Sequence, residues 1–238
     1  MADDSLRSVT APIHLIGGGR EHTRKGPDPL LEAVFADARK PHPSVAYVGV
    51  ASDDDRDFFG WLSGLFRQAG AGEVRLVPLA SPRSDLSAAR ALLERCDLVF
   101  ISGGDVEAGM RHLERHGLGS DLRNLHRDGK PLFGLSAGSI MLARCWVRWT
   151  DPRDDGSAEV FPCLGIAPLV CDTHAESDGW EELRTLLTLT GETVGLGIPG
   201  GAALRIGPDG ALSALGRAIH RLGCRDGHVE RLTDLAPR

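Results

Sequence analysis

Short apolar runs punctuate the first half of the chain. They are rich in Val, Ile, Leu and Phe without strict alternation of apolar and polar positions, and most of them end in glycine, serine or aspartate. They cover residues 13–16, 45–50, 74–79, 98–101 and 132–135. Runs of this kind are typical of strands that are buried on both faces of a parallel sheet.

Segments with helical periodicity separate these runs. Apolar positions recur at helical spacing over residues 29–38, 58–69, 86–93 and 106–116. The alternation predicts an α/β fold with a doubly wound, mostly parallel sheet and helices on both faces, a flavodoxin-like three-layer sandwich. Ligands bind at the carboxyl ends of the strands in such sheets, where this chain carries its glycine, serine and aspartate residues.

The second half of the chain is less regular. Its pattern predicts an apolar helix over residues 139–145, a polar loop over 149–158, a helix over 177–187 and short strands over 196–198, 203–206 and 211–215. We expect a single domain over residues 11–236, preceded by a flexible leader at residues 1–10.

Composition narrows the function classes. The 238 residues carry a formal net charge of -6, so a nucleic-acid partner is not expected. No run approaches the roughly 18 apolar residues of a spanning helix, and the polar start predicts neither signal peptide nor anchor, so we expect a cytoplasmic protein without a membrane partner. Five cysteines without a CxxC pair indicate buried free thiols rather than disulfides or a zinc site.

Gly134-Leu135-Ser136-Ala137-Gly138 has the form G-x-S-x-G. It follows an apolar strand and opens an apolar helix, as a nucleophile elbow requires. The strained turn would expose the Ser136 hydroxyl and aim the Ala137 N–H at an oxyanion. The alternative is a tight strand–helix turn with an inert serine.

Two further strand ends carry candidate residues. Gly104 follows the run at 98–101, and its N–H could complete an oxyanion hole, while Asp105 could cap the next helix. His174 follows a short apolar run, 38 residues after Ser136, and is the best-placed of nine histidines to act as the base that a serine nucleophile needs.

Four segments together carry a family resemblance. They are Ile-Gly-Gly-Gly (16–19), Ile-Ser-Gly-Gly-Asp (101–105), Gly-Leu-Ser-Ala-Gly-Ser (134–139) and Leu-Gly-Ile-Ala-Pro-Leu-Val-Cys-Asp-Thr-His (164–174). Together they resemble the dipeptidase E and cyanophycinase family of serine peptidases. The resemblance spans about residues 13 to 206. It implies a fold related to class I glutamine amidotransferases and a cytoplasmic peptidase that cleaves small or unusual peptides.

The resemblance also implies roles for individual residues. Ser136 matches the nucleophile and His174 the base, the Gly104 and Ala137 N–H groups match the oxyanion hole, and Asp105 matches a residue that lines the substrate site.

The triad acid departs from the family pattern. Glycine stands at position 200, where the family usually has glutamate. Such an acid orients the imidazole, and its loss can cost about 10⁴ in rate. Candidate replacements are Asp151, which we place first, Asp172 and Glu176; the last is also a candidate substrate-binding residue. Family members that favour aspartyl substrates carry arginines on the helix after the histidine, whereas residues 177–184 here hold one, Arg184, among several acids. The resemblance therefore does not imply a strong preference for an N-terminal aspartate.

These observations predict a dipeptidase-like serine peptidase that hydrolyses small peptides by acyl transfer and needs no metal or cofactor. Two alternatives remain open: a weak or inactive relative that binds a small peptide or amino acid, and an amidase or esterase using the same site. Relatives of this kind form monomers and dimers, so a homodimer is one expected state.

Overall fold

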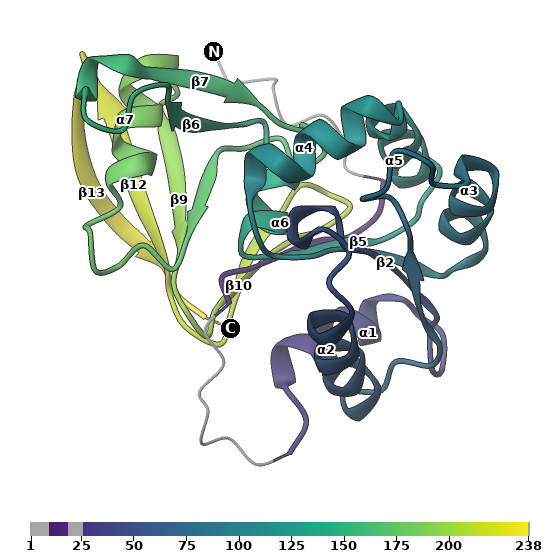
Figure 1. Ribbon diagram of the computed structural model, residues 1–238. Coiled ribbons are helices and arrows are strands. Elements are labelled where there is room, and N and C mark those ends of the chain that lie inside the picture. The colour runs from purple at the N-terminus through teal and green to yellow at the C-terminus, as the bar shows by residue number, and fades with distance from the viewer. Residues whose placement is uncertain (1–9, 19–25, 238) are drawn as a thin grey trace.

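A computed structural model describes residues 10–18 and 26–237 of the chain (Figure 1). The predicted leader lies almost wholly outside the described residues. In order along the central sheet, the strands are β11 (Leu212–Leu215), β10 (Ala203–Ile206), β1 (Ile13–Ile16), β5 (Leu132–Leu135), β4 (Leu98–Ile101), β2 (Val45–Val48) and β3 (Val74–Val77). The five strands from β1 to β3 are mutually parallel, and β10 and β11 add an antiparallel edge. The predicted mostly parallel sheet is confirmed.

Helices cover both faces of this sheet, as predicted (Figure 1). The core on one face joins the sheet to α1 (Pro29–Asp37) and α2 (Arg56–Gln68). The core on the other face joins it to α3 (Leu86–Arg95), α4 (Val106–Arg115), α5 (Leu118–Arg127) and α6 (Ala137–Leu142). Successive strand residues serve opposite faces, since Phe100 packs in the first core and Ile101 in the second.

Aspartates begin several of these helices. Each lies at an N-cap and accepts a hydrogen bond from an amide of the first turn, which satisfies a donor that the helix itself leaves unpaired. The pairs are Asp28 with Leu30, Asp55 with Phe58, Asp85 with Ala88 and Asp105 with Ala108. The caps explain why the helices begin directly after the strand-end loops.

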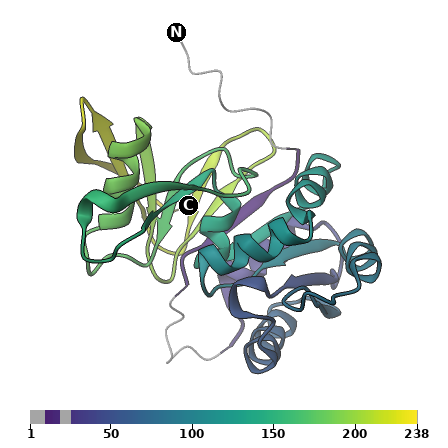
Figure 2. The same ribbon diagram turned by 45° about the horizontal axis from the view of Figure 1, so that its top comes forward.

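A second sheet, formed by strands from the second half of the chain, lies beside the first (Figure 2). Its order is β13 (His228–Leu235), β12 (Ile219–Arg225), β9 (Val194–Ile198) and β8 (Cys171–Thr173). A hairpin of β6 (Cys145–Trp149) and β7 (Ala158–Pro162), the helix α7 (Glu181–Thr190) and a short 3₁₀ turn at Asp155–Ser157 (η2) complete this part. Another 3₁₀ turn, Val50–Ser52 (η1), lies between β2 and α2. β9 leads directly into β10, so residues 199–202 connect the two sheets.

Several sequence predictions in this half were wrong in extent. The helix predicted over 139–145 ends at Leu142, and Cys145 already begins β6. The helix predicted from residue 177 begins at Glu181, because Trp180 takes a left-handed backbone and packs in the core. The polar segment 149–158 connects β6 and β7. All five cysteines are free thiols, and in the described ranges no helix is long and apolar enough to cross a bilayer.

Candidate active site

Ser136 lies between β5 and α6 in a backbone conformation that few side chains adopt. Its φ is 52° and its ψ is -120°. Its N–H donates to the Ile16 carbonyl oxygen at 2.8 Å, which fixes the turn against the neighbouring strand β1. A non-glycine residue with positive φ costs energy and persists only where the surroundings impose it. The geometry is that of a sharp strand-to-helix elbow.

The two glycines of the motif let the chain make this turn. A Cβ on Gly134 would lie 2.5 Å from the backbone of Gly138, and a Cβ on Gly138 would lie 2.1 Å from the carbonyl oxygen of Ile101. Both distances are too short for any side chain. Gly138 therefore allows α6 to pack directly on the end of β4.

We expect Gly138→Ala to destabilise the fold by about 1–3 kcal/mol, because the new methyl group would push α6 away from β4. Gly64→Ala is the matched control: Gly64 lies inside α2, a Cβ there meets nothing within 4 Å, and alanine favours helix by about 0.5–1 kcal/mol. Urea unfolding of both variants measures the difference. Equal stability of the two would contradict close packing at Gly138.

His174 faces the serine from the second sheet. It follows β8, with φ of 44°, and its N–H donates to the Ile198 carbonyl oxygen at 2.9 Å. Its Nε2 lies 2.7 Å from the Ser136 Oγ. The structure thus brings together two predicted site residues that are 38 positions apart. A hydroxyl at this distance can pass its proton to an imidazole.

Two glycines line the approach to this pair. A Cβ on Gly18 would lie 3.6 Å from His174 Cδ2 and 3.8 Å from Ser136 Cβ, and one on Gly103 would lie 3.5 Å from Ser136 Cβ. Their missing side chains leave the serine accessible. Gly103 is thus the glycine of its loop that lies against the serine.

Gly104, the predicted oxyanion residue, packs on a different neighbour. Its φ is 140°, and a Cβ there would lie 1.9 Å from the Ala51 carbonyl oxygen in η1. That oxygen accepts the N–H of Asp105 at 2.7 Å. Among the described residues the Gly104 N–H has no hydrogen-bond acceptor, and Ala137 supplies the first N–H of α6. Both amides thus stay candidates for an oxyanion hole.

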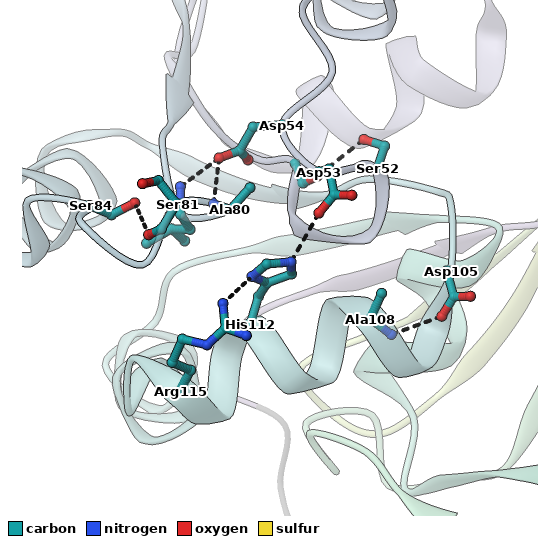
Figure 3. Close-up of polar contacts among 12 residues, drawn as sticks. Ser52, Asp53, Asp54, Ala80, Ser81, Ser84, Asp105, Ala108, His112 and Arg115 are labelled. Carbon is teal, nitrogen blue, oxygen red and sulfur yellow. Dashed lines mark hydrogen bonds and ion pairs between the residues drawn. The ribbon is translucent and has the colours of Figure 1, made fainter.

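Asp105 caps α4, and a neighbouring loop supports it (Figure 3). Its Oδ1 accepts the Ala108 N–H at 2.8 Å. Beside it, the Asp53 carboxylate lies 3.0 Å from His112 Nε2, and Asp54 Oδ2 accepts the amides of Leu79 and Ala80. These contacts hold η1 against Gly104. The capping role is the one observed for Asp105; a part in lining the substrate site stays a prediction.

The structure does not bring Asp151 to the histidine. Asp151 lies in the exposed turn after β6, where its Oδ1 accepts the Arg153 N–H at 3.0 Å. Glu176 accepts the Gly200 N–H at 3.0 Å and lies 3.5 Å from Arg217 Nη1. In the described ranges no carboxylate accepts a hydrogen bond from His174, so none of the three predicted acids orients its ring through such a bond. Glu176 nevertheless places a carboxylate beside position 200.

One buried acid and one half-buried acid belong to the elements on either side of the histidine in the chain, β8 and α7. Asp172, two residues before it on β8, is 4% exposed, and its Oδ2 meets no donor among the described residues. Burial and the nearby Glu182 carboxylate raise the pKa of Asp172 to about 7, although the Thr173 amide opposes the rise. Burial also raises the pKa of Glu182. The Trp146 indole, whose Nε1 donates to Glu182 Oε2 at 2.6 Å, and His174 oppose this rise. Sequence reasoning missed Glu182, because its acidic segment is equally typical of a helix start.

Comparison with known proteins places this geometry in a family. The model of peptidase family S51 matches residues 13–213 of the chain, which includes both Ser136 and His174. The chain belongs to peptidase family S51. The resemblance seen in the sequence is thereby confirmed. A cyanophycinase from Synechococcus elongatus is 28% identical over 161 residues, which is 64% of this chain and 50% of that protein. The chain therefore matches about half the length of this curated relative.

Solved structures show the same fold. A peptidase from an acI-B1 actinobacterium superposes with a TM-score of 0.73 at 18% identity and covers 96% of this chain and 98% of its own. A Listeria monocytogenes protein described as a peptidase E gives a TM-score of 0.58 at 13% identity, over 94% of this chain and 99% of its own. At these identities the likeness concerns the fold alone.

Proposed function

We propose that this member of peptidase family S51 is a serine peptidase that hydrolyses small peptides by acyl transfer. The observation that carries the proposal is the 2.7 Å contact between Ser136 Oγ and His174 Nε2 on a strained elbow. Family membership supports peptide hydrolysis. The free thiols are in keeping with a reducing, cytoplasmic compartment.

In the proposed reaction, the Ser136 hydroxyl attacks the scissile carbonyl carbon while His174 takes its proton. The carbonyl oxygen gains negative charge, which the Gly104 and Ala137 N–H groups would stabilise. His174 then gives the proton to the leaving amine, and the C–N bond breaks. Water, deprotonated by the same imidazole, releases the acyl group from the serine.

Labelling with a fluorophosphonate tests the proposal. Such a probe reacts with a serine whose proton a base removes, so we expect a single adduct on Ser136, measured by mass spectrometry after digestion. Ser136→Ala should abolish the adduct and His174→Gln should slow its formation by about 10²-fold or more. Ser120→Ala is the control and should label like the parent, because Ser120 lies exposed on α5 with its hydroxyl bonded to the Gly117 carbonyl oxygen.

A second candidate function has one observation in its favour. Glycine occupies position 200, and the described carboxylates make no hydrogen bond to His174. A chain that had lost activity would keep the fold and could bind a small peptide or amino acid. If Ser136 gave no adduct and dipeptides bound without being cleaved, this binding function would replace the proposed peptidase.

A further inference from the structure

An apolar cavity opens next to the catalytic pair, on the face of the sheet covered by α1 and α2. Its volume is about 100 Å³. The carboxyl ends of β1, β4 and β5 form its floor, and the two helices form its sides. The side chains that matter here are Ile16, Leu31, Trp61, Leu65, Phe100 and Leu135.

Three residues of the cavity lining lie next to the candidate active site in space or in the chain. Gly18 lines the cavity and also lies against both Ser136 and His174. Leu135, which lines it too, immediately precedes the nucleophile. Gly201 completes this wall and donates its N–H to the Gly18 carbonyl oxygen at 2.8 Å. These three residues place the cavity beside Ser136, where a group attached to a substrate would lie.

The chemistry of the lining favours a hydrocarbon group. Among the described residues that line the cavity, Asp28 is the charged one, and its Oδ1 already accepts the Leu30 N–H as the cap of α1. Trp61 at the cavity is 54% exposed and stacks on Phe58. A large aromatic side chain left this open contributes little to the core. It becomes buried on its inner side when an apolar group fills the cavity.

We propose that this cavity binds an aliphatic side chain of about leucine size, carried by the substrate residue next to the scissile bond. The inference rests on the proposed function and specifies its substrate class. An apolar cavity of about 150 Å³ can hold benzene, so one of about 100 Å³ suits a branched aliphatic side chain. Burial of such a side chain corresponds to about tenfold or more in selectivity over alanine.

Binding and cleavage of dipeptides test the inference separately. The probes are Leu-Gly, Ala-Gly and Asp-Gly, and the reversed set Gly-Leu, Gly-Ala and Gly-Asp. With the Ser136→Ala chain, NMR titration should show one leucine dipeptide binding about tenfold or more tighter than its alanine and aspartate counterparts. With the parent chain, the same leucine dipeptide should have the highest kcat/KM. If the Leu-Gly set shows the leucine preference, the residue before the scissile bond enters the cavity; if the Gly-Leu set shows it, the residue after that bond does.

Two variants locate the effect. Leu65→Trp fills the cavity and should reduce the leucine preference to about that of alanine. Leu189→Trp makes the same change at an exposed position of α7 and should leave the preference unchanged. Should Leu65→Trp not fold, Trp61→Ala, which opens the exposed side of the cavity, should lower the preference instead.

The outcomes separate the inference from the proposed function. Equal or tighter binding of the alanine or aspartate dipeptides would overturn the inference, even in a chain with an active serine. An unchanged preference in a folded Leu65→Trp or Trp61→Ala chain would overturn it as well. Selective leucine binding without cleavage or a Ser136 adduct would overturn the peptidase function and uphold the cavity assignment.

Discussion

Ser136→Ala is expected to lower kcat/KM for dipeptide hydrolysis by about 10³- to 10⁶-fold while the chain stays folded. The hydroxyl is the atom that would form the acyl bond, and no other group stands 2.7 Å from His174 Nε2 among the described contacts. The lower end of the range applies if His174, which has no hydrogen-bonded acid, is a weak base. The parent enzyme would then be less active, and the loss caused by Ser136→Ala would be smaller.

Steady-state kinetics on leucine, alanine and aspartate dipeptides measures this effect, with circular dichroism and urea unfolding as checks on the fold. Ser120→Ala should keep the parental rate. Alanine at position 136 retains the positive φ, so the elbow itself should survive. A Ser136→Ala chain that cleaved at the parental rate would exclude Ser136 as the nucleophile.

Asp172→Asn is expected to stabilise the protein at neutral and higher pH. In the unfolded chain the carboxyl ionises near its ordinary pKa of 3.8, whereas in the fold burial raises that pKa to about 7. The folded state therefore holds a proton that the unfolded state releases, so this residue destabilises the fold progressively as the pH rises from about 4 to about 7. Asparagine removes the charge and keeps an oxygen for the Thr173 amide.

The gain should be small near pH 4 and reach about 2–4 kcal/mol by pH 8. Urea unfolding of parent and variant between about pH 4 and pH 8.5 gives the curve. Asp155→Asn is the control, because Asp155 lies exposed in η2 and its replacement should give a flat difference. A gain that does not depend on pH, or a loss of stability at pH 8, would contradict an uncompensated acid at Asp172.

The parts of this structure that sequence could predict are those with a local cause. Short runs rich in apolar residues mark the strands of a parallel sheet, and this pattern predicts all five of them, including the edge strand β3 with its exposed Arg75. The elbow is predictable because Gly134 and Gly138 flank Ser136 between a strand and a helix, a combination that few ordinary turns share. The position of His174 at a strand end distinguishes it from the other histidines.

Other parts depend on tertiary contacts that leave no local trace. β12 and β13 are half-exposed, and their sequence from residue 219 to 235 mixes charged and apolar positions without a clean period. The start of α7 is set by the burial of Trp180, which the acidic residues around it do not reveal. Glu176 reaches Gly200 across 24 residues, and such a contact requires the fold to be known.

The positive φ of Ser136 also restricts how this position can change in evolution. A β-branched threonine would clash in that backbone region, so one hydroxyl nucleophile cannot be exchanged for the other at low cost. Glycine, by contrast, fits the turn with less strain than serine itself. In a descendant that no longer needs the nucleophile, a substitution to glycine would relieve the backbone strain and leave an inert elbow. Retention of serine at this position therefore requires selection for the hydroxyl.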